Sequence, residues 1–495
     1  MRNIAKTILI LGALASASCS DYLTEDLQGI YSNATFYKTE DHAFLALTGI
    51  YNSVSFNSSD NDLWVFGDVA SDDAIKGGQA GDQTDIQYID DFSYARNNGF
   101  IEKIWKRYYD GISRANYLLY YGPNIDMDET LKARVLGEAK FLRAYLYFNL
   151  VNIFGEIPLK LSPPLTQADI YKHKSPVADI YAQIEKDLTE AVAVVDEKYT
   201  GADLGRVSKG AAWGMLAKVK LYQGKWQESL DAIAEVDKLG LYALQQVYKN
   251  NFIDSTQNNS ESLFEIQHIS GFALGSYLNQ WFASPNPDGN GYFFDAPVQN
   301  FVNEFEVTPG DVTDPRLDYT VGRPGQPWIN DDVFDATWSP STGYLSKKHL
   351  QPLRENPVIG DGSLNYVYLR YADILLMKAE ALNELDRAGE ALIPLNAIRK
   401  RARESYLYDK GLAGYGAVPA DLLPDVASPD KGTVRNAIRH ERRVELGLEF
   451  HRYFDLMRYG QAPAEAALAG TGFDYSKRYF PVPQSEIDTN PEINK

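Results

Sequence analysis

The sequence predicts a mainly α-helical protein, in which a scaffold of helical repeats similar to tetratricopeptide units carries an inserted, loop-rich subdomain. Two observations lead to this fold class. Apolar residues recur at three- and four-residue spacing over most of the chain, as they do in amphipathic helices. One block, residues 251–365, lacks that periodicity and is rich in proline and glycine turn signals. With 495 residues, the chain is long enough for several such parts.

The N-terminal residues have the composition of a bacterial lipoprotein signal. Arg2 and Lys6 precede a short apolar run, residues 7–15, and small side chains then lead to Cys19, the only cysteine of the chain. The apolar run is shorter than the roughly 20 residues that are needed to span a bilayer. These features indicate export from the cytoplasm and attachment to a membrane surface through a lipid.

We expect residues 1–18 to be removed as a signal peptide, Cys19 to be acylated, and residues 19–40 to form a polar tether. Such signals usually have leucine three places before the cysteine, where this chain has Ser16. The alternative, an ordinary secreted protein with one unmodified thiol, therefore stays open. In both cases the protein works outside the cytoplasm.

A first helical region is expected over residues 41–250. Its periodic segments are residues 41–54, 101–121, 129–154 and 175–240. Gly155 stands where a helix C-terminus is expected, and Ser175 before Pro176 has the pattern of a helix N-terminus with serine as the cap. Residues 55–100 are rich in Asp, Gly and Ser, and we expect them to form long loops.

Two segments look like copies of one helical hairpin. In the first copy, a helix is followed by a tight turn at Gly224 and by a second helix that opens at Trp226. Small residues let the two helices approach and an aromatic side chain fills their crossing, as in a tetratricopeptide unit of about 34 residues. The second copy lies 162 positions later, and the matching pairs are Met215 with Met377, Ala217 with Ala379, and Leu230 with Leu392.

The block 251–365 contrasts with these helices. It contains Trp281, Trp328 and Trp338, three of the seven tryptophans. Because a structureless loop of this length is improbable in a compact domain, we expect a subdomain of short strands and long loops.

Residues 366–495 form the expected C-terminal helical region, with helices over 366–404 and 431–460. The last helix carries charges at three- and four-residue spacings, namely Glu441, Glu445, Arg452, Asp455 and Arg458. Glu441 and Glu445 are like charges one helical turn apart, so they need nearby cations. We therefore interpret this stretch as an ion-pair network that fixes the helix, in preference to a catalytic site.

Composition and motifs exclude several functions. A formal net charge of −19 argues against binding of nucleic acid or of anionic lipid through a basic patch. The chain has no nucleophile elbow, phosphate-binding loop, dinucleotide fingerprint or zinc-protease motif, and its six histidines are not spaced as metal ligands. The Asp-rich loops could supply oxygen ligands to calcium, but no loop has the spacing of an EF-hand, so we expect no metal and leave calcium as an open alternative. We expect no cofactor and no enzymatic activity.

The aromatic residues of the loop-rich segments are the best candidates for a binding site. Exposed Trp and Tyr rings present flat apolar faces that match the C–H faces of sugars, and neighbouring polar side chains can bond the hydroxyls. The predicted ligand-binding residues are Asp73, Tyr94, Asn97, Trp281, Tyr292, Phe294, Trp328 and Trp338. For each one alone, a place in a small hydrophobic cluster under a loop is at least as good an interpretation.

Five segments, in this order along nearly the whole chain, resemble the signatures of the SusD/RagB family of outer-membrane nutrient-binding lipoproteins. They are WKRYYDGISRAN (105–116), GEAKFLRAYLYFNLVNIFGEIPL (137–159), RYADILLMKAEALNE (370–384), RHERRVELGLEFHRYFDLMRYG (439–460) and YFPVPQSEIDTNP (479–491).

The resemblance implies an α-helical fold in which four tetratricopeptide-like units support a more irregular half. It also implies a lipid-anchored protein on the outside of the outer membrane, which caps a SusC-like TonB-dependent transporter and helps to deliver a glycan or another nutrient. Members bind their ligand and do not cleave it. The loops at 55–100 and 270–340 would then face the ligand, and the helical half the transporter. Because the ligand-contacting loops vary with substrate, the resemblance assigns no ligand residue.

Four functions remain to be distinguished. A surface glycan-binding protein is the leading hypothesis, and the same fold could instead bind peptides or other small nutrients. An extracytoplasmic glycoside hydrolase would use two carboxylates at a set separation, which a sequence does not show. A purely structural scaffold would bind only its transporter, and mutation of the loop tryptophans would then change no ligand affinity.

Overall fold

The computed structural model describes residues 36–495, except 286–290, 330–331, 353 and 356–359. The predicted signal peptide, Cys19 and residues 20–35 of the tether therefore lie outside the described residues. Among the residues that are described, no helix is both long and apolar enough to cross a bilayer.

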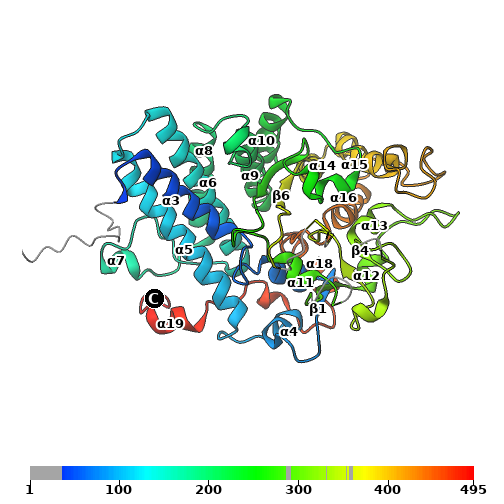
Figure 1. Cartoon of the computed structure of the whole chain (residues 1–495), viewed down its shortest axis with the longest axis horizontal. Coiled ribbons are helices and arrows are strands. Elements are labelled where there is room, and N and C mark those ends of the chain that lie inside the picture. The colour runs from blue at the N-terminus through cyan, green and yellow to red at the C-terminus, as the bar shows by residue number, and fades with distance from the viewer. Residues whose placement is uncertain (1–35, 286–290, 330–331, 353, 356–359) are drawn as a thin grey trace, which may run out of the picture.

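The predicted mainly helical fold is confirmed (Figure 1). The longer helices are α3 (Glu40–Val54), α5 (Gly99–Tyr121), α6 (Glu129–Phe154), α8 (Val177–Val192), α9 (Lys209–Tyr222), α10 (Trp226–Leu239), α14 (Tyr371–Glu384), α15 (Ala388–Tyr408), α16 (Lys431–Leu446) and α17 (Arg452–Tyr459). The shorter helices are α4 (Thr84–Asp90), α7 (Gln167–Ile170), α11 (Leu278–Phe282), α12 (Gln299–Val302), α13 (Arg316–Thr320), α18 (Gln461–Ala467) and α19 (Gln484–Thr489).

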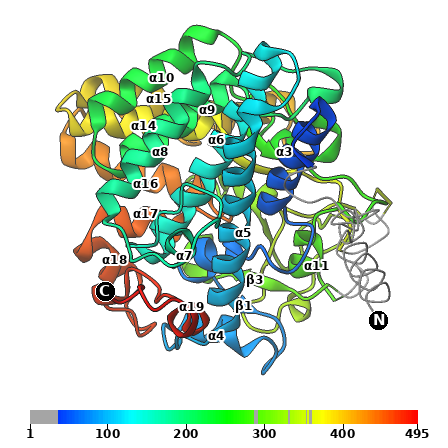
Figure 2. The ribbon, with the colours of Figure 1, turned by 90° about the vertical axis from the view of Figure 1, so that its left-hand side faces the viewer.

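The long helices pack as successive pairs, α3 with α5, α6 with α8, α9 with α10, and α14 with α15. Contacts of α5 with α6, α8 with α9, and α10 with α14 join one pair to the next (Figure 2). Met215 and Met377 are both fully buried, at corresponding places in α9 and α14. The hairpin repeat read from the sequence is thus present, and stacking of its copies builds a continuous core.

In the first helical region, helix boundaries agree closely with the sequence pattern, except at the start of α8. Helix α6 ends at Gly155, whose φ of 71° suits glycine. Ser175 was expected to cap α8, but Pro176 is the cap residue, and no side chain caps this helix. The reason is that the Ser175 N–H donates to the Ile157 carbonyl at 2.9 Å, which holds Ser175 in an extended bridge before the helix.

Residues 55–100 are more ordered and more buried than the predicted long loops. They contain a π-helix, Val65–Val69, a strand and α4. A Cβ on Gly67 would lie 2.4 Å from the Phe450 carbonyl oxygen, so glycine lets this segment pass directly against the C-terminal region. Because of this close contact, the apolar residues in and around the π-helix are buried, although the residues on either side of them are polar.

The described strands are short and pair two by two, all antiparallel. They are β1 (Ala74–Gly77) with β3 (Phe294–Pro297), β2 (Ser262–Ile266) with β6 (Tyr366–Arg370), and β4 (Val321–Gly322) with β5 (Leu345–Ser346). In register, Ala74 faces Pro297, and Ser262 faces Arg370. The short strands expected in the loop-rich block are therefore present, and β1 and β6 tie that block to the segments before and after it (Figure 1).

Two predicted C-terminal helices differ from the structure. The segment Tyr366–Arg370 is strand β6, because two tyrosines and the β-branched Val367 between them favour pairing with β2 over a helix. The predicted helix 431–460 is broken into α16 and α17 between Gly447 and His451. Leu448 and Phe450 adopt positive φ values of 60° and 66° in this break, which a continuous helix does not allow.

The predicted ion-pair network on α16 is confirmed. Glu445 is fully buried and accepts from Arg370 Nη1 at 2.6 Å and from Arg316 Nη1 at 2.9 Å, and it also pairs with Arg401. Burial alone raises the pKa of Glu445, but the arginines outweigh burial and hold this pKa well below its usual range. The like-charged neighbour Glu441 is satisfied in the same way, because Arg316 Nη1 also donates to it at 2.5 Å.

Candidate functional site

Five aromatic side chains cluster where α11 and β3 meet. Trp281 is central, with ring centroids 5.5 Å from Trp64, 5.4 Å from Phe294, 5.6 Å from Tyr292 and 5.7 Å from Tyr277. Trp281 is only 3% exposed and Phe294 is fully buried, whereas Tyr292 is 39% exposed and Tyr277 is half-buried. We call Tyr277 and Tyr292 the aromatic edge, because they are the members of this cluster that reach the surface.

Backbone hydrogen bonds fix the positions of both tyrosines. The Tyr277 N–H donates to the Phe56 carbonyl at 2.6 Å, and the Tyr292 N–H donates to the Gln280 carbonyl at 2.9 Å. Burial and the neighbouring Tyr292 hydroxyl raise the pKa of Tyr277 to about 12, so its hydroxyl stays protonated at neutral pH. The aromatic edge is therefore a fixed surface with two hydroxyl groups.

A pocket of about 460 Å³ lies beside β1, and we call it the β1 pocket. It is lined by residues 75–82, Thr84, Gln87, Pro340 and Ser341. Lys76 holds the turn in this lining, because its Nζ donates to the Gln79 carbonyl at 3.1 Å and to the Asp82 carbonyl at 2.8 Å. The walls thus combine a hydrogen-bonded turn with polar side chains.

The Phe294 ring connects the β1 pocket to the aromatic edge. A Cβ on Gly78 would lie 2.5 Å from Phe294 Cε1, so the turn can cover this ring only because residue 78 is glycine with a φ of 66°. On its other side, the Phe294 ring centroid is 6.4 Å from that of Tyr292. The pocket and the edge therefore share one buried aromatic support, and their combination can accept a ligand that has both apolar faces and hydroxyl groups.

Trp328 and Trp338 belong to a second aromatic cluster, together with Phe334. Centroid distances are 5.1 Å from Trp328 to Phe334 and 5.3 Å from Phe334 to Trp338. Trp328 is 4% exposed and supports the cluster from within, whereas Trp338 is half-buried. Trp338 precedes Pro340 by two residues, so it lies close in sequence to the wall of the β1 pocket.

The structure places Asp73 in the interior, away from solvent. Asp73 is fully buried and its Oδ1 accepts from Arg443 Nε at 2.7 Å, while the adjacent Asp72 binds Arg452 at 2.7 Å. These ion pairs fasten the start of β1 to the C-terminal helices. Asp73 therefore positions the β1 turn and offers no free carboxylate to a ligand.

Tyr94 and Asn97 lie between α4 and α5, and Tyr94 packs against the C-terminal segment. The Tyr94 ring centroid is 4.8 Å from that of Phe480, and burial raises its pKa above the usual range. Asn97 is exposed. The structure thus divides the predicted set: it groups Trp281, Tyr292 and Phe294, and it gives Tyr94 different neighbours.

Sequence reasoning missed two parts of this site. Tyr277 precedes Trp281 by four residues, and that helical spacing was a usable signal for a shared face. The β1 turn contains the pair Gly77 and Gly78, both at positive φ, which marks a tight turn but does not reveal a pocket. Pairing of β1 with β3, which creates the site, joins segments more than 200 residues apart.

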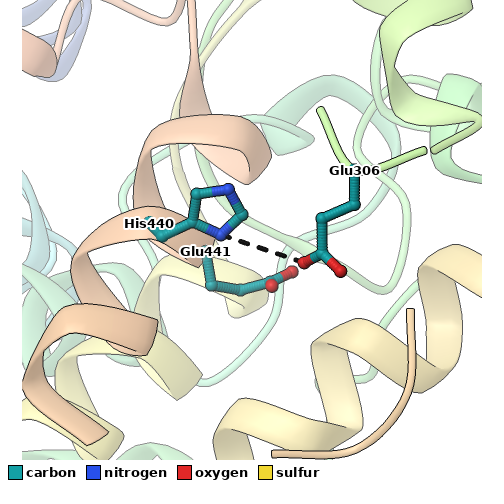
Figure 3. Close-up of side chains that lie close together, drawn as sticks. All are labelled: Glu306, His440 and Glu441. Carbon is teal, nitrogen blue, oxygen red and sulfur yellow. Dashed lines mark ion pairs between the residues drawn. The ribbon is translucent and has the colours of Figure 1, made fainter. Parts of the chain in front are cut away.

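One cluster among the described residues has the composition of a metal site. Glu306, His440 and Glu441 place candidate ligand atoms within 4.8 Å of one another (Figure 3). However, Arg399 Nη1 donates to Glu306 at 2.6 Å and to Glu441 at 3.0 Å, so a guanidinium already balances both carboxylates. The cluster is better described as an extension of the buried ion-pair network than as a metal centre.

Comparison with known sequences defines the class of protein. The sequence model of the SusD family matches residues 248–495, half of the chain, and a second, described as starch-binding associating with outer membrane, matches residues 57–221. This chain belongs to the SusD family.

Relatives and solved structures extend this likeness over nearly the whole chain. SusD-like protein P38 of Formosa agariphila is 26% identical over 100% of this chain and 98% of its own length. The structure of a laminarin binding SusD-like protein has a TM-score of 0.76 and 28% identity, and covers 92% of this chain and 99% of that one. Surface glycan-binding protein A from Bacteroides fluxus has a TM-score of 0.74 and 25% identity, over 91% and 97%.

Proposed function

We propose that this protein binds a polysaccharide or oligosaccharide through the aromatic edge and the β1 pocket, and that it does not cleave its ligand. The observation that carries the proposal is the pair Tyr277 and Tyr292, which stand on buried Trp281 beside a pocket with polar walls. The family relationship supports a carbohydrate ligand, because a relative of known structure with 28% identity binds laminarin.

The physical basis is the dual character of a sugar. Its C–H faces are apolar and pack on aromatic rings, while its hydroxyls need hydrogen-bond partners. Tyr277 and Tyr292 supply rings and hydroxyls, and Gln79, Thr84 and Gln87 line the adjoining pocket. Trp338 extends the aromatic surface on the far side of that pocket in our proposal.

Binding without hydrolysis is supported by the state of the two carboxylates at the start of β1. Asp73 is buried and paired with Arg443, and Asp72 is paired with Arg452. A hydrolase would need one carboxylic acid and one carboxylate free to approach the glycosidic bond. Incubation of the purified protein with the bound glycan, followed by product analysis, tests this part; released oligosaccharides would contradict it.

The proposed setting is the outer membrane, with the lipid on Cys19 as anchor and a SusC-like TonB-dependent transporter as partner. The sequence signal at Cys19 supports the anchor, and the description of the second family model, associating with outer membrane, supports the location. Uptake would then consist of ligand capture by the loop-rich half and transfer into the transporter. Affinity purification of the full-length protein from membranes tests whether such a transporter accompanies it.

The ligand site is tested by affinity electrophoresis of residues 20–495 in gels that contain laminarin or other polysaccharides. Tyr277→Ala, Tyr292→Ala and Trp338→Ala are compared with Tyr408→Ala, which removes a similarly exposed tyrosine at the end of α15. We expect retardation by at least one glycan, weakened in the first set and retained in the control. Equal retardation of all variants would place the site elsewhere, and no retardation by any glycan would favour a peptide or another nutrient.

A further inference from the structure

A second pocket, of about 430 Å³, lies where the C-terminal segment crosses the ends of α6 and α8. We call it the C-terminal pocket. Its lining includes three basic residues, Arg96, Lys174 and Arg478, and one acidic residue, Glu156. It shares no lining residue with the β1 pocket, so it is separate from the proposed glycan site.

The basic side chains of this pocket form no hydrogen bond or ion pair within the described chain. In those residues, nearly every arginine side chain donates a hydrogen bond or forms an ion pair; the exceptions are Arg96, Arg439 and Arg478. Arg439 stacks on Tyr459 at 4.1 Å, whereas Arg96 and Arg478 both line the C-terminal pocket. Lys174 also has no ion pair or hydrogen bond from its ammonium group there.

This lack of counter-ions is unusual in a chain with a net charge of −19. Carboxylates are abundant, and arginines such as Arg316, Arg370 and Arg442 pair with them even in the core. Glu156 is exposed and forms no ion pair with the three cations of the pocket. The pocket is therefore a local positive region on an acidic protein, and such a region concentrates anions.

The start of helix α8 adds to this positive region. Val177, the first residue of α8, lines the pocket, and the cap residue Pro176 provides no side-chain acceptor. The N–H groups of Val177 and Ala178 have no acceptor among the described residues. A 16-residue helix presents partial positive charge at this end, and free N–H groups there bind the oxygens of anions.

The walls of the pocket are held in place before any ligand arrives. Gly155 ends α6 at a φ of 71°, and a Cβ on it would lie 2.8 Å from Tyr479 Cδ2, so the Tyr479 ring lies directly against this glycine. Arg478 stacks on the Tyr479 ring at 4.9 Å, and the Phe480 N–H donates to the Ile153 carbonyl at 2.8 Å. The guanidinium and the ring are thus positioned together, which lowers the entropic cost of binding.

We propose that the C-terminal pocket binds an oxyanion, a carboxylate or a sulfate, carried by a sugar acid. Arg96, Lys174, Arg478 and the α8 N-terminus hold the anionic group, and arginine suits carboxylate and sulfate because its fork of N–H donors matches their oxygens. Tyr479, Pro481 and Val482 offer the less polar wall for the sugar ring. The volume lies within the roughly 300–1,000 Å³ of small-molecule sites.

Isothermal titration calorimetry of residues 20–495 tests the proposal with three probes: D-glucuronate, inorganic sulfate and neutral D-glucose, at constant ionic strength. We expect D-glucuronate to bind at least tenfold more tightly than D-glucose, and more weakly as sodium chloride is added. The double variant Arg96→Gln/Arg478→Gln should lose about tenfold or more in affinity, since it removes both guanidinium groups that would donate charge-assisted hydrogen bonds to the anion. Arg439→Gln is the matched control, because that arginine is also stacked and unpaired.

The possible outcomes distinguish a sugar acid from a free inorganic oxyanion as the ligand. They do not depend on whether the proposed glycan site is correct. Tighter binding of D-glucuronate than of sulfate supports a sugar acid, whereas equal binding of both reduces the ligand to a free inorganic oxyanion and overturns the sugar-acid part. Equal D-glucuronate affinity in the wild type and the double variant overturns the whole proposal. If the double variant unfolds, Lys174→Gln gives the same comparison. Retardation by neutral polysaccharides should be unchanged in all these variants.

Discussion

Arg370 and Glu445 form a buried ion pair of 2.6 Å between the end of strand β6 and helix α16. The same guanidinium reaches Glu261 at 2.8 Å and Glu449 at 2.8 Å. One side chain therefore fastens the small β2–β6 sheet of the loop-rich half to the C-terminal helices. The positions of the strands relative to the scaffold depend on this charged core as much as on apolar packing.

Glu445→Gln should strongly destabilise the fold. The substitution keeps the size of the side chain but removes the charge that faces Arg316, Arg370 and Arg401, so these buried cations share one carboxylate fewer. Breaking one partner of a buried ion pair typically costs about 3–5 kcal/mol. Urea unfolding measures the loss. As a control, Glu404→Gln disrupts the exposed pair with Lys400 and should change stability by less than about 0.5 kcal/mol.

Trp281→Ala should act on stability before it acts on binding. Trp281 is 3% exposed and packs against Trp64 and Phe294, so its removal leaves a cavity under the aromatic edge. Truncation of a buried tryptophan typically costs about 3–5 kcal/mol. The midpoint of chemical denaturation should fall clearly below that of Tyr292→Ala. Similar midpoints for both variants would mean that the Trp281 ring is not packed as described.

Gly155→Ala should cost more stability than Gly240→Ala. Gly240 has a φ of 64° and a ψ of 19° with open space around it, so alanine adds only the strain of the left-handed helical region, about 1–2 kcal/mol. Gly155, with a φ of 71° and a ψ of −116°, lies outside that region, and the new Cβ would also clash with Tyr479. We expect Gly155→Ala to lower the free energy of unfolding by at least about 2 kcal/mol more than Gly240→Ala does. If thermal unfolding showed the same loss of stability for both variants, the Tyr479 ring would have to move aside without an energetic penalty.

The contribution of His349 to stability should decrease as the pH falls from 6.5 toward 4. Burial lowers the pKa of His349 from 6.5 to about 4, so the folded state keeps the neutral ring while the unfolded chain takes up a proton. Its contribution is thus present above pH 6.5 and is lost toward pH 4, at up to about 1.4 kcal/mol per pH unit.

His349→Gln isolates this contribution. The His349 Nε2 contacts the Leu448 carbonyl at 2.9 Å, and a glutamine amide can donate to the same oxygen. The slope of the unfolding free energy against pH is proportional to the number of protons taken up on unfolding. Between pH 6 and 4.5, this slope should decrease in the variant by the equivalent of about one proton. Asp62, whose pKa burial raises to about 8, acts in the opposite direction, but it is common to both proteins. An unchanged slope would contradict a neutral buried His349.

Much of the helical scaffold follows from the sequence, and the reason is local. Periodic apolar residues, cap residues and glycines act within a few turns, so the spans of α3, α5 and α6 agree with the pattern to within about two residues. The charge pattern of α16 likewise predicted its cations, because like charges one turn apart require them. Strand β6 was missed because its pairing with β2 spans about 100 residues, and no local signal encodes that partner.

The sequence by itself determined the class of fold, the hairpin repeat and the family resemblance, since these depend on local pattern and on the order of motifs. Tertiary structure alone decided which aromatic residues reach solvent. Trp281 and Phe294 lie inside and Tyr292 outside because β1 pairs with β3 across more than 200 residues. The same holds for Arg96 and Arg478, which become neighbours only because the C-terminal segment crosses the ends of α6 and α8. The burial of a side chain and the charges around it depend on segments that are distant in the sequence, so a local stretch of sequence does not determine them.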